Sequence, residues 1–105
     1  DPAYTNFFTA VYLKNAVTNT ASNPTAFSKA SPADVLVDVT SSSGTNAVKS
    51  VYMDGAPVGF AYLSISGVDV TLDKTYVGTL TNGDHTILVE FTQGNAVSVT
   101  LTVGA

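Results

Sequence analysis

The sequence predicts an all-β protein folded as a small antiparallel sandwich, and three observations lead to that prediction. Apolar and polar residues alternate over several short stretches, so successive side chains point to opposite faces of a strand. Turn dipeptides such as Ser66-Gly67 separate these stretches at short intervals. No convincing pattern of a long helix interrupts them. Short strands punctuated by turns are typical of β-sandwiches.

The two strands nearest the C-terminal end are the clearest. The stretch 85–92 places Ile87, Val89 and Phe91 on one face, and 96–103 alternates aliphatic residues with serine and threonine. A short connection that contains a glycine joins them, which is typical of a β-hairpin. We expect the strands upstream to pack against this hairpin.

The start of the chain differs from the rest, because an extended segment over 1–13 carries large apolar residues on both faces. A solvent-exposed edge strand of a monomer does not carry apolar residues on both faces, whereas a strand covered on both faces does. We therefore predict an N-terminal β arm over 1–13. Residues 14–23 are small and polar and predict a linker with one short strand around 16–17. The large apolar residues of the arm are Tyr4, Phe7, Phe8, Val11, Tyr12 and Leu13.

Residues 24–105 predict the sandwich itself, with seven to eight short strands. In 33–40 the alternation turns the valines inward and the aspartates Asp34 and Asp38 outward. The other expected strands and edge segments are 24–29, 47–53, 60–65 and 68–72, followed by the C-terminal hairpin. This pattern predicts an immunoglobulin-like antiparallel β-sandwich, although cysteine and tryptophan, which build the core of antibody domains, are absent.

Two connections carry signals of their own. Asp54-Gly55-Ala56-Pro57 predicts a tight turn. The stretch 73–80 breaks the alternation, and Asp73 is placed to cap a single helical turn that would seat Tyr76 and Leu80 on the core.

Composition excludes several classes of function. Charged residues make up 11% of the chain, its four cationic residues are all lysines, and the net charge is −4, so we expect no basic patch for nucleic acid. Without cysteine, neither disulfides nor thiolate metal sites can form. No apolar run approaches the roughly 20 residues of a membrane helix, so we expect no membrane insertion. The low charge fits a protein that works outside the cell or packs into an assembly.

The stretch 24–103 resembles the X2 family of immunoglobulin-like modules, which occur in bacterial scaffoldins and multidomain glycoside hydrolases. The resemblance implies an extracellular, non-catalytic module, and such modules are credited with weak polysaccharide or cell-wall binding and with spacing their neighbours. The family pattern does not include the arm. The residues that carry the resemblance are Ala26-Phe27-Ser28-Lys29, Asp34-Val35, Val68 to Leu72 with Lys74 and Tyr76, Leu80 before Asn82-Gly83, and Val89-Glu90-Phe91 with Gly94-Asn95.

The arm has three interpretations. It is a strand of its own sandwich, a remnant of a preceding domain, or a strand that completes the sheet of a neighbouring copy, as in donor-strand pilin complexes. A head-to-tail exchange does not close on itself, so it would build a filament. Our main hypothesis is therefore a non-catalytic extracellular structural subunit that self-assembles with copies of itself into a pilus-like filament or surface structure.

The alternative hypothesis is an X2-like accessory module of a larger secreted enzyme or scaffoldin, associated with carbohydrate or the cell wall. Aromatic rings stack on the apolar faces of sugars, but tyrosine is equally common in a sheet core with its hydroxyl at the surface. The candidate sugar-stacking residues are Tyr52, Phe60, Tyr62 and Tyr76.

No catalytic constellation emerges, and we predict no enzyme. His85 is the single histidine, and no Gly-x-Ser-x-Gly elbow is present to supply a nucleophile. Glu90 is the single glutamate, so a pair of catalytic glutamates cannot form. A Lys–Asn isopeptide crosslink would need a buried Lys29 or Lys49 assisted by Glu90 or Asp38, and both carboxylates are expected to face outward.

Metal sites and cofactors are not predicted either. Four aspartates lie in or next to turns, but none belongs to an Asp-x-Asp-x-Asp-Gly calcium loop, so we interpret them as solvated. These aspartates are Asp54, Asp69, Asp73 and Asp84.

Overall fold

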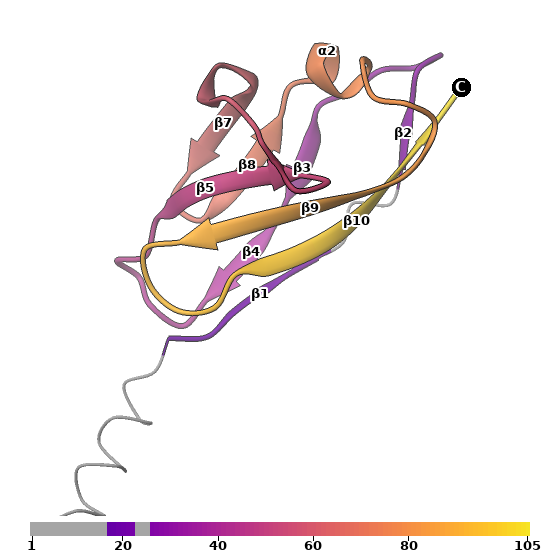
Figure 1. The fold of residues 1–105 in the computed structure, drawn as a ribbon. Coiled ribbons are helices and arrows are strands. Elements are labelled where there is room, and N and C mark those ends of the chain that lie inside the picture. Colours follow the sequence, from indigo (N-terminus) through magenta and orange to yellow (C-terminus); the bar gives the residue numbers. More distant parts are fainter. Residues whose placement is uncertain (1–16, 23–25) are drawn as a thin grey trace, which may run out of the picture.

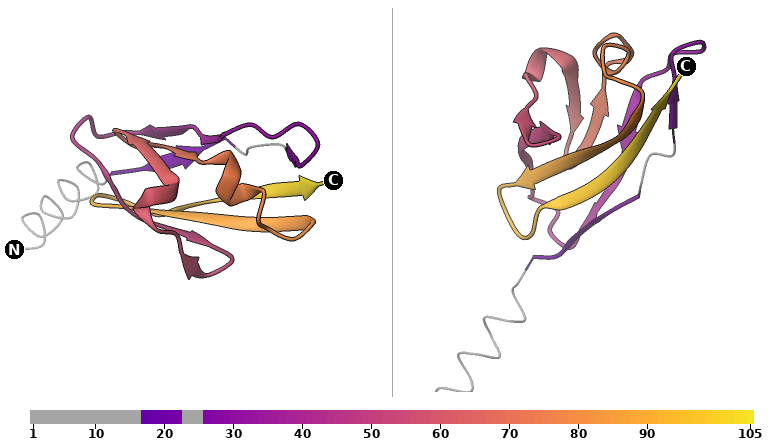
Figure 2. Two further views of the ribbon diagram at one scale, coloured as in Figure 1. Left: turned by 90° about the horizontal axis from the view of Figure 1, so that it is seen from above. Right: turned by 45° about the vertical axis from the view of Figure 1, so that its right-hand side comes forward.

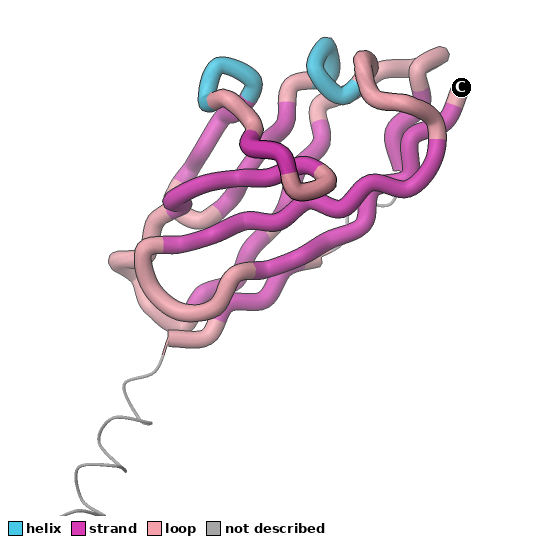
Figure 3. The backbone as a smooth tube through the Cα atoms, in the orientation of Figure 1, coloured by secondary structure: helices cyan, strands magenta, loops and turns pink. Residues whose placement is uncertain are grey.

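The computed structural model describes residues 17–22 and 26–105, which form a two-layered β-sandwich (Figure 1). The prediction of an all-β, immunoglobulin-like sandwich is confirmed. Two short helical pieces, η1 (Phe60–Tyr62) and α2 (Lys74–Val77), interrupt the strands (Figure 3). The strands are β1 (Asn19–Ala21), β2 (Ala26–Ser28), β3 (Val35–Val37), β4 (Val39–Ser41), β5 (Val48–Met53), β6 (Ala56–Pro57), β7 (Leu63–Ser66), β8 (Asp69–Leu72), β9 (Gly83–Phe91) and β10 (Val97–Gly104).

One layer is a five-stranded sheet in the order β2-β10-β9-β5-β6. The predicted C-terminal hairpin forms its centre, with β10 and β9 antiparallel from the pair Val97–Val89 to the pair Val103–Gly83. The edge strand β2 runs parallel to the end of β10, where Phe27 pairs with Val103. The two longest strands of the sandwich thus lie side by side and carry the other strands of this sheet.

The second layer consists of the three-stranded sheet β3-β8-β7 and the pair β1-β4 (Figure 2). The predicted strand 33–40 is divided at Asp38 into β3 and β4. The carboxylate of Asp69 on β8 accepts a hydrogen bond from the backbone N–H of Val39 at 2.9 Å and so ties the second half to the sheet. Such divisions and the short edge strands give ten strands in the described residues, in place of the expected seven to eight.

The core lies between the layers and is mainly aliphatic. The predicted inward residues of the C-terminal hairpin are all buried, as are the three valines of 33–40. Burying each large apolar side chain stabilises the fold by roughly 1.5–3 kcal/mol. The residues with the largest side chains and no more than 1% exposure are Leu72, Ile87, Leu101, Val37, Val51, Val70, Val77 and Val89.

The segment 14–23, expected to be a polar linker, contributes β1 from its described part, 17–22, and β1 pairs with β4. The reason is a buried side chain. Asn19 is 2% exposed, and its amide nitrogen donates to the carbonyls of Gln93 and Asn95 at 3.0 and 2.8 Å. A polar residue can therefore anchor a strand when its hydrogen-bonding groups are satisfied.

Two sequence-predicted local features are present. Asp54 and Gly55 both have positive φ, 53° and 85°, and form the two-residue turn between β5 and β6. Asp73 caps α2 by accepting a hydrogen bond from the N–H of Thr75 at 3.2 Å. One expectation is wrong, because residues 60–62 of the predicted strand 60–65 form η1 instead. The arm over 1–13 lies outside the described residues.

Candidate functional site

The outer face of the three-stranded sheet carries a row of side chains set by strand register. Leu36 on β3 pairs with Thr71 on β8, and Thr71 pairs with Ser64 on β7. The residues that follow Leu36 and precede Thr71, Val37 and Val70, are buried in the core, so the side chains of the row face the opposite way. This row forms the floor of the candidate site.

A second set of side chains lies two residues away along the chain from this row, just beyond the strand ends: Asp34 before β3, Asp73 after β8 and Tyr62 at the end of η1. The backbone N–H of Asp73 donates to the carbonyl of Tyr62 at 2.9 Å, which extends the contact between β7 and β8 to this level. A groove of about 190 Å³ lies here, and these three residues line it together with Ser64 and Thr71. The register therefore places one aromatic ring, two carboxylates and two hydroxyls around one groove.

The ring of Tyr62 is held in place by a second tyrosine. Tyr62 and Tyr76 stack with ring centroids 5.0 Å apart and planes 20° apart. Tyr62 is 48% exposed, and Phe60 at the start of η1 is 60% exposed. Burial raises the pKa of Tyr76, and the charges of Asp54 and Tyr62 act in the same direction. Stacking fixes the orientation of an otherwise free surface ring, as a binding platform requires.

The carboxylates of the groove are positioned by backbone hydrogen bonds at the start of α2. Asp34 accepts from the N–H of Lys74 at 2.9 Å, and Asp73 accepts from Thr75. Each carboxylate keeps further lone pairs that can accept from a ligand. The groove can therefore accept hydrogen bonds at two fixed points beside an aromatic surface.

The structure brings together only part of the predicted aromatic set. Tyr62 and Tyr76 stack, and Phe60 is two residues from Tyr62 in the same helical turn. Tyr52 lies in the other sheet, on β5, where it pairs with Leu88 and Pro57. The arm residues Tyr4, Phe7, Phe8, Val11, Tyr12 and Leu13 lie outside the described residues.

Sequence reasoning did not assign a ligand to Asp34, Ser64, Thr71 or Asp73. A signal for one of them was present, since Asp34 occupies an outward position of an alternating strand. Which outward residues of different strands become neighbours depends on register, and alternation within a strand does not determine register.

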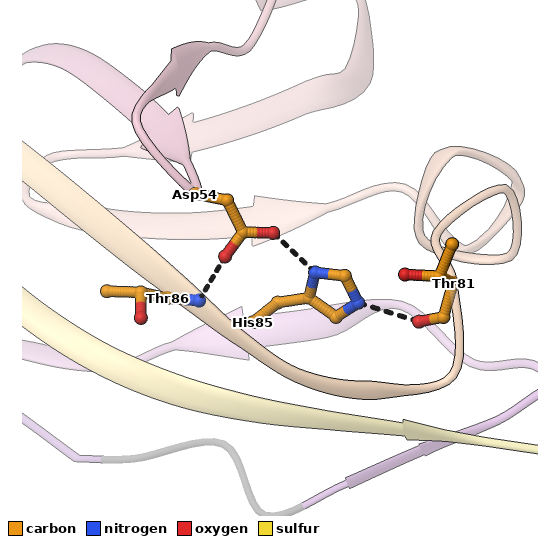
Figure 4. Close-up of polar contacts among 4 residues, drawn as sticks. All are labelled: Asp54, Thr81, His85 and Thr86. Carbon is orange, nitrogen blue, oxygen red and sulfur yellow. Dashed lines mark hydrogen bonds and ion pairs between the residues drawn. The ribbon is translucent and has the colours of Figure 1, made fainter.

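His85, the single histidine considered above as a catalytic residue, forms a hydrogen bond through each of its two ring nitrogens (Figure 4). Its Nδ1 contacts the carboxylate of Asp54 at 2.5 Å, and its Nε2 contacts the carbonyl of Thr81 at 2.7 Å. Both partners are acceptors, so both ring nitrogens donate and the ring is favoured as an imidazolium. The Thr81 carbonyl and then Asp54 raise the pKa of His85. A histidine held in this way joins a turn to a strand and leaves no free nitrogen for acid–base chemistry.

Asp54 is fixed at the same contact. Its second carboxylate oxygen accepts from the N–H of Thr86 at 2.8 Å, and its own N–H donates to the carbonyl of Thr86 at 2.8 Å. The hydrogen bond from Thr86, followed by that from His85, lowers the pKa of Asp54. The turn between β5 and β6 is thereby fastened to β9.

Other chemistry finds no support within residues 17–22 and 26–105. These residues contain no group of three or more histidine or acidic side chains that could hold a metal ion. Lys29 and Lys49 are both exposed, so neither is the buried lysine that an isopeptide crosslink needs. None of the helices in this part of the chain is long and apolar enough to cross a membrane.

Comparison with known proteins shows the fold alone. No family model and no curated protein matches the chain. Among solved structures, the chain is similar to SGBP-B of the mixed-linkage glucan utilization locus of Bacteroides ovatus, determined in complex with a mixed-linkage heptasaccharide. The TM-score is 0.51 and the identity 20%, over 85% of this chain and 23% of that one.

Two further structures score lower. The endo-β-1,4-mannanase of Thermotoga petrophila has a TM-score of 0.49 at 16% identity, over 85% of this chain and 20% of the mannanase. The fibronectin(III)-like modules of Clostridium thermocellum CbhA have a TM-score of 0.47 at 12% identity, over 85% of this chain and 47% of that one. The chain thus spans less than half of each of these three structures. The similarity to SGBP-B supports the sandwich fold and nothing further, and the resemblance to X2 modules stays a prediction.

Proposed function

We propose that the chain is a non-catalytic, extracellular accessory module of a larger protein and that the groove at Tyr62 binds a neutral polysaccharide. One observation carries the proposal: the half-exposed Tyr62 ring is stacked in place on Tyr76 and borders a groove with two carboxylates. This function corresponds to the alternative hypothesis from the sequence, in which the chain is an X2-like accessory module.

The chemistry of the groove matches that of a sugar. A pyranose ring presents an apolar face, which stacks on an aromatic ring, and hydroxyls around its rim. Asp34 and Asp73 accept hydrogen bonds from such hydroxyls, and Ser64 and Thr71 either donate or accept them. Asp34 and Asp73 also oppose an anionic ligand in the groove, in a chain whose net charge is −4. We therefore propose a neutral glycan.

The proposal that the module is non-catalytic is supported by the state of its acid–base groups. His85 uses both ring nitrogens in internal contacts, and neither contact reaches a nucleophile. Ser50 donates to Glu90 at 3.1 Å, which keeps the single glutamate engaged on the five-stranded sheet and away from the groove. The similarity to SGBP-B, a protein solved with a bound glucan oligosaccharide, supports the choice of a β-glucan as the first ligand to test.

The test is isothermal titration with a mixed-linkage β-glucan oligosaccharide. Loss of the stacking ring in Tyr62→Ala should weaken binding about tenfold, which corresponds to ~1.4 kcal/mol. Tyr52→Ala is the matched control, because it removes the same side chain from the other sheet and should leave the affinity unchanged. Equal losses in both variants, or no saturable binding of any neutral glycan by the unchanged chain, would show that the groove is not a sugar site.

Self-assembly through the arm is a second candidate function. It is supported by where the described chain begins. The Asn19 network lies beside Gln93 and Asn95 in the β9–β10 connection, whereas Gly104 pairs with Ser28 at the far end of β10. Val17, beside Gly94, and Gly104 therefore lie at opposite ends of the sandwich, as a head-to-tail filament requires.

Sedimentation of the full chain tests this second candidate. A filament subunit should sediment as a large species and fall to monomer when residues 1–13 are removed. A sedimentation profile that is monomeric with and without those residues would exclude strand exchange and leave the accessory module.

A further inference from the structure

A second cavity lies next to the Tyr62 groove, on the other side of the start of α2. Its volume is about 330 Å³, larger than that of the groove, and it opens between the end of β2 and α2. Phe27 and Pro32 supply apolar walls, and Gly78 lines the cavity on the α2 side. The cavity lies between α2 and β2, and β2 runs beside the end of β10 (Figure 1).

Positive charge distinguishes this cavity. Lys29 and Lys74 line it, which places two of the four cationic side chains of the chain at one site. No acidic residue is among its lining residues. Within residues 17–22 and 26–105, the ion pair that forms is His85–Asp54, so neither ammonium group is paired with a carboxylate there. Two exposed lysines without an ion-pair partner in this part of the chain, lining one cavity of an acidic protein, favour an anion over a cation there.

Hydroxyls complete the cavity. Thr75 and Thr79 line it beside the lysines. Thr79 donates its hydroxyl hydrogen to the carbonyl of Tyr76 at 2.6 Å, so its oxygen can act toward a ligand only as an acceptor. The lysines of the cavity can attract an anionic group. The cavity's hydroxyl oxygens and apolar walls can contact the hydroxyls and the ring of the sugar that carries this group.

The two cavities share the first turn of α2. Asp73, which caps α2, lines the groove, and the next residue, Lys74, lines the cavity. Asp34 in the groove accepts a hydrogen bond from the backbone N–H of Lys74, a residue that lines the cavity. The backbone of Lys74 therefore lies between the acidic groove and the basic cavity. A single glycan could occupy both, with a neutral unit at Tyr62 and an acidic unit at the lysines.

We propose that the cavity lined by Lys29 and Lys74 binds the carboxylate of a uronic acid residue in a polysaccharide. This inference rests on the proposed function, because it names the class of glycan that the same end of the module takes. The polysaccharide is then a neutral chain that carries acidic units, in place of a uniformly neutral one. Carboxylate and phosphate share the chemistry that lysines recognise, so the experiment includes both.

The experiment is an NMR titration of the full chain, following backbone amide shifts. The first probe is a xylo-oligosaccharide that carries one glucuronic acid, and the second is the same oligosaccharide without it. The acidic probe should shift Lys29, Thr75, Gly78 and Thr79 saturably, and the neutral probe should leave them unmoved. Lys29→Gln and Lys74→Gln should each weaken binding of the acidic probe about twofold to fivefold, as for exposed charge pairs.

Lys49→Gln is the matched control, because Lys49 is an exposed lysine on β5, outside the cavity, and should not change the affinity. Equal weakening in this variant would overturn the proposal, as would equal affinity for inorganic phosphate, for an acidic peptide or for the neutral probe. The same spectra separate this proposal from the proposed function. Shifts at Tyr62, Ser64 and Thr71 report the groove. Their absence here and in the same titration with the mixed-linkage β-glucan oligosaccharide would contradict the neutral-glycan proposal, while the lysine cavity is judged on its own shifts.

Discussion

The outer faces of the two sheets differ in the residues that they expose. On β10 the outward positions are small hydroxyl residues, on β9 they are Asp84, Thr86, Leu88 and Glu90, and Thr102 donates to Asp84 at 2.6 Å across the pair. On the three-stranded sheet the outward side chains include Leu36, 52% exposed, and Tyr62, 48% exposed. Serine and threonine are typical of a sheet face that is only exposed to solvent, whereas exposed apolar groups close together on one face indicate a binding surface. Among the described residues, the exposed large hydrophobic side chains lie on the three-stranded sheet and in η1, beside the candidate groove, and none lies on β9 or β10.

The largest effect should come from the five-stranded sheet. Leu101 is 0% exposed at the centre of β10, so Leu101→Ala should reduce the free energy of unfolding by about 2–5 kcal/mol through lost burial and a residual cavity. Chemical denaturation measures this loss. The control Ser98→Ala, at an outward position of the same strand, should change it by less than ~0.5 kcal/mol. Similar losses in both variants would contradict the assignment of faces.

A smaller loss is expected where β1 meets the β9–β10 connection. A Cβ added at Gly94, whose φ is +80°, would lie 2.5 Å from the carbonyl oxygen of Val17. Gly94→Ala should therefore cost about 1–3 kcal/mol of stability from backbone strain and displacement of β1. Gly67→Ala is the control, because its φ is also positive, +62°, but no atom lies within 4 Å. If Gly67→Ala costs as much in thermal unfolding, close packing of β1 does not matter.

The smallest effect concerns pH. The pKa of His85 is raised above its ordinary 6.5, so its contribution to stability is fully present below pH 6.5 and is lost as pH rises through the raised value. The pKa of Asp54 is lowered below 3.8, so its contribution is present above that pH and is lost as pH falls through the lowered value. Stability from this pair should be greatest between these two limits.

His85→Gln isolates that contribution. Thermal unfolding of the variant should lack the decline in stability above pH 6.5 that we expect for the unchanged chain, whose His85 pKa is raised. Parallel pH profiles for the two proteins would mean that the contact between the β5–β6 turn and β9 is not stabilised by the imidazolium.

The regular part of the fold is predictable from sequence because one face of each long strand is buried. Alternation of Ile87, Val89 and Phe91 with polar residues identified both β9 and its inner face. The β1 strand was harder to predict, since Asn19 is polar and its burial depends on partners more than 70 residues away. Alternation within a strand cannot reveal hydrogen bonds over such a separation.

The candidate site was predictable only in part, for a related reason. Aromatic type alone selected Tyr62 and Tyr76, but it selected Tyr52 equally, although that residue lies in the other sheet. Asp34, Asp73 and Tyr62 line one groove because of the register of three strands. Lys29 and Lys74 line one cavity because of how α2 packs beside β2. Both are tertiary properties that a single sequence does not display.

The most direct test of the division between the two sheets is to map a bound neutral β-glucan oligosaccharide by NMR amide shifts. We expect saturable shifts at Tyr62, Ser64, Thr71 and Asp73 and none at Thr86, Ser98 and Thr100 on the five-stranded sheet. Shifts confined to the five-stranded sheet, or spread evenly over both, would contradict this expectation.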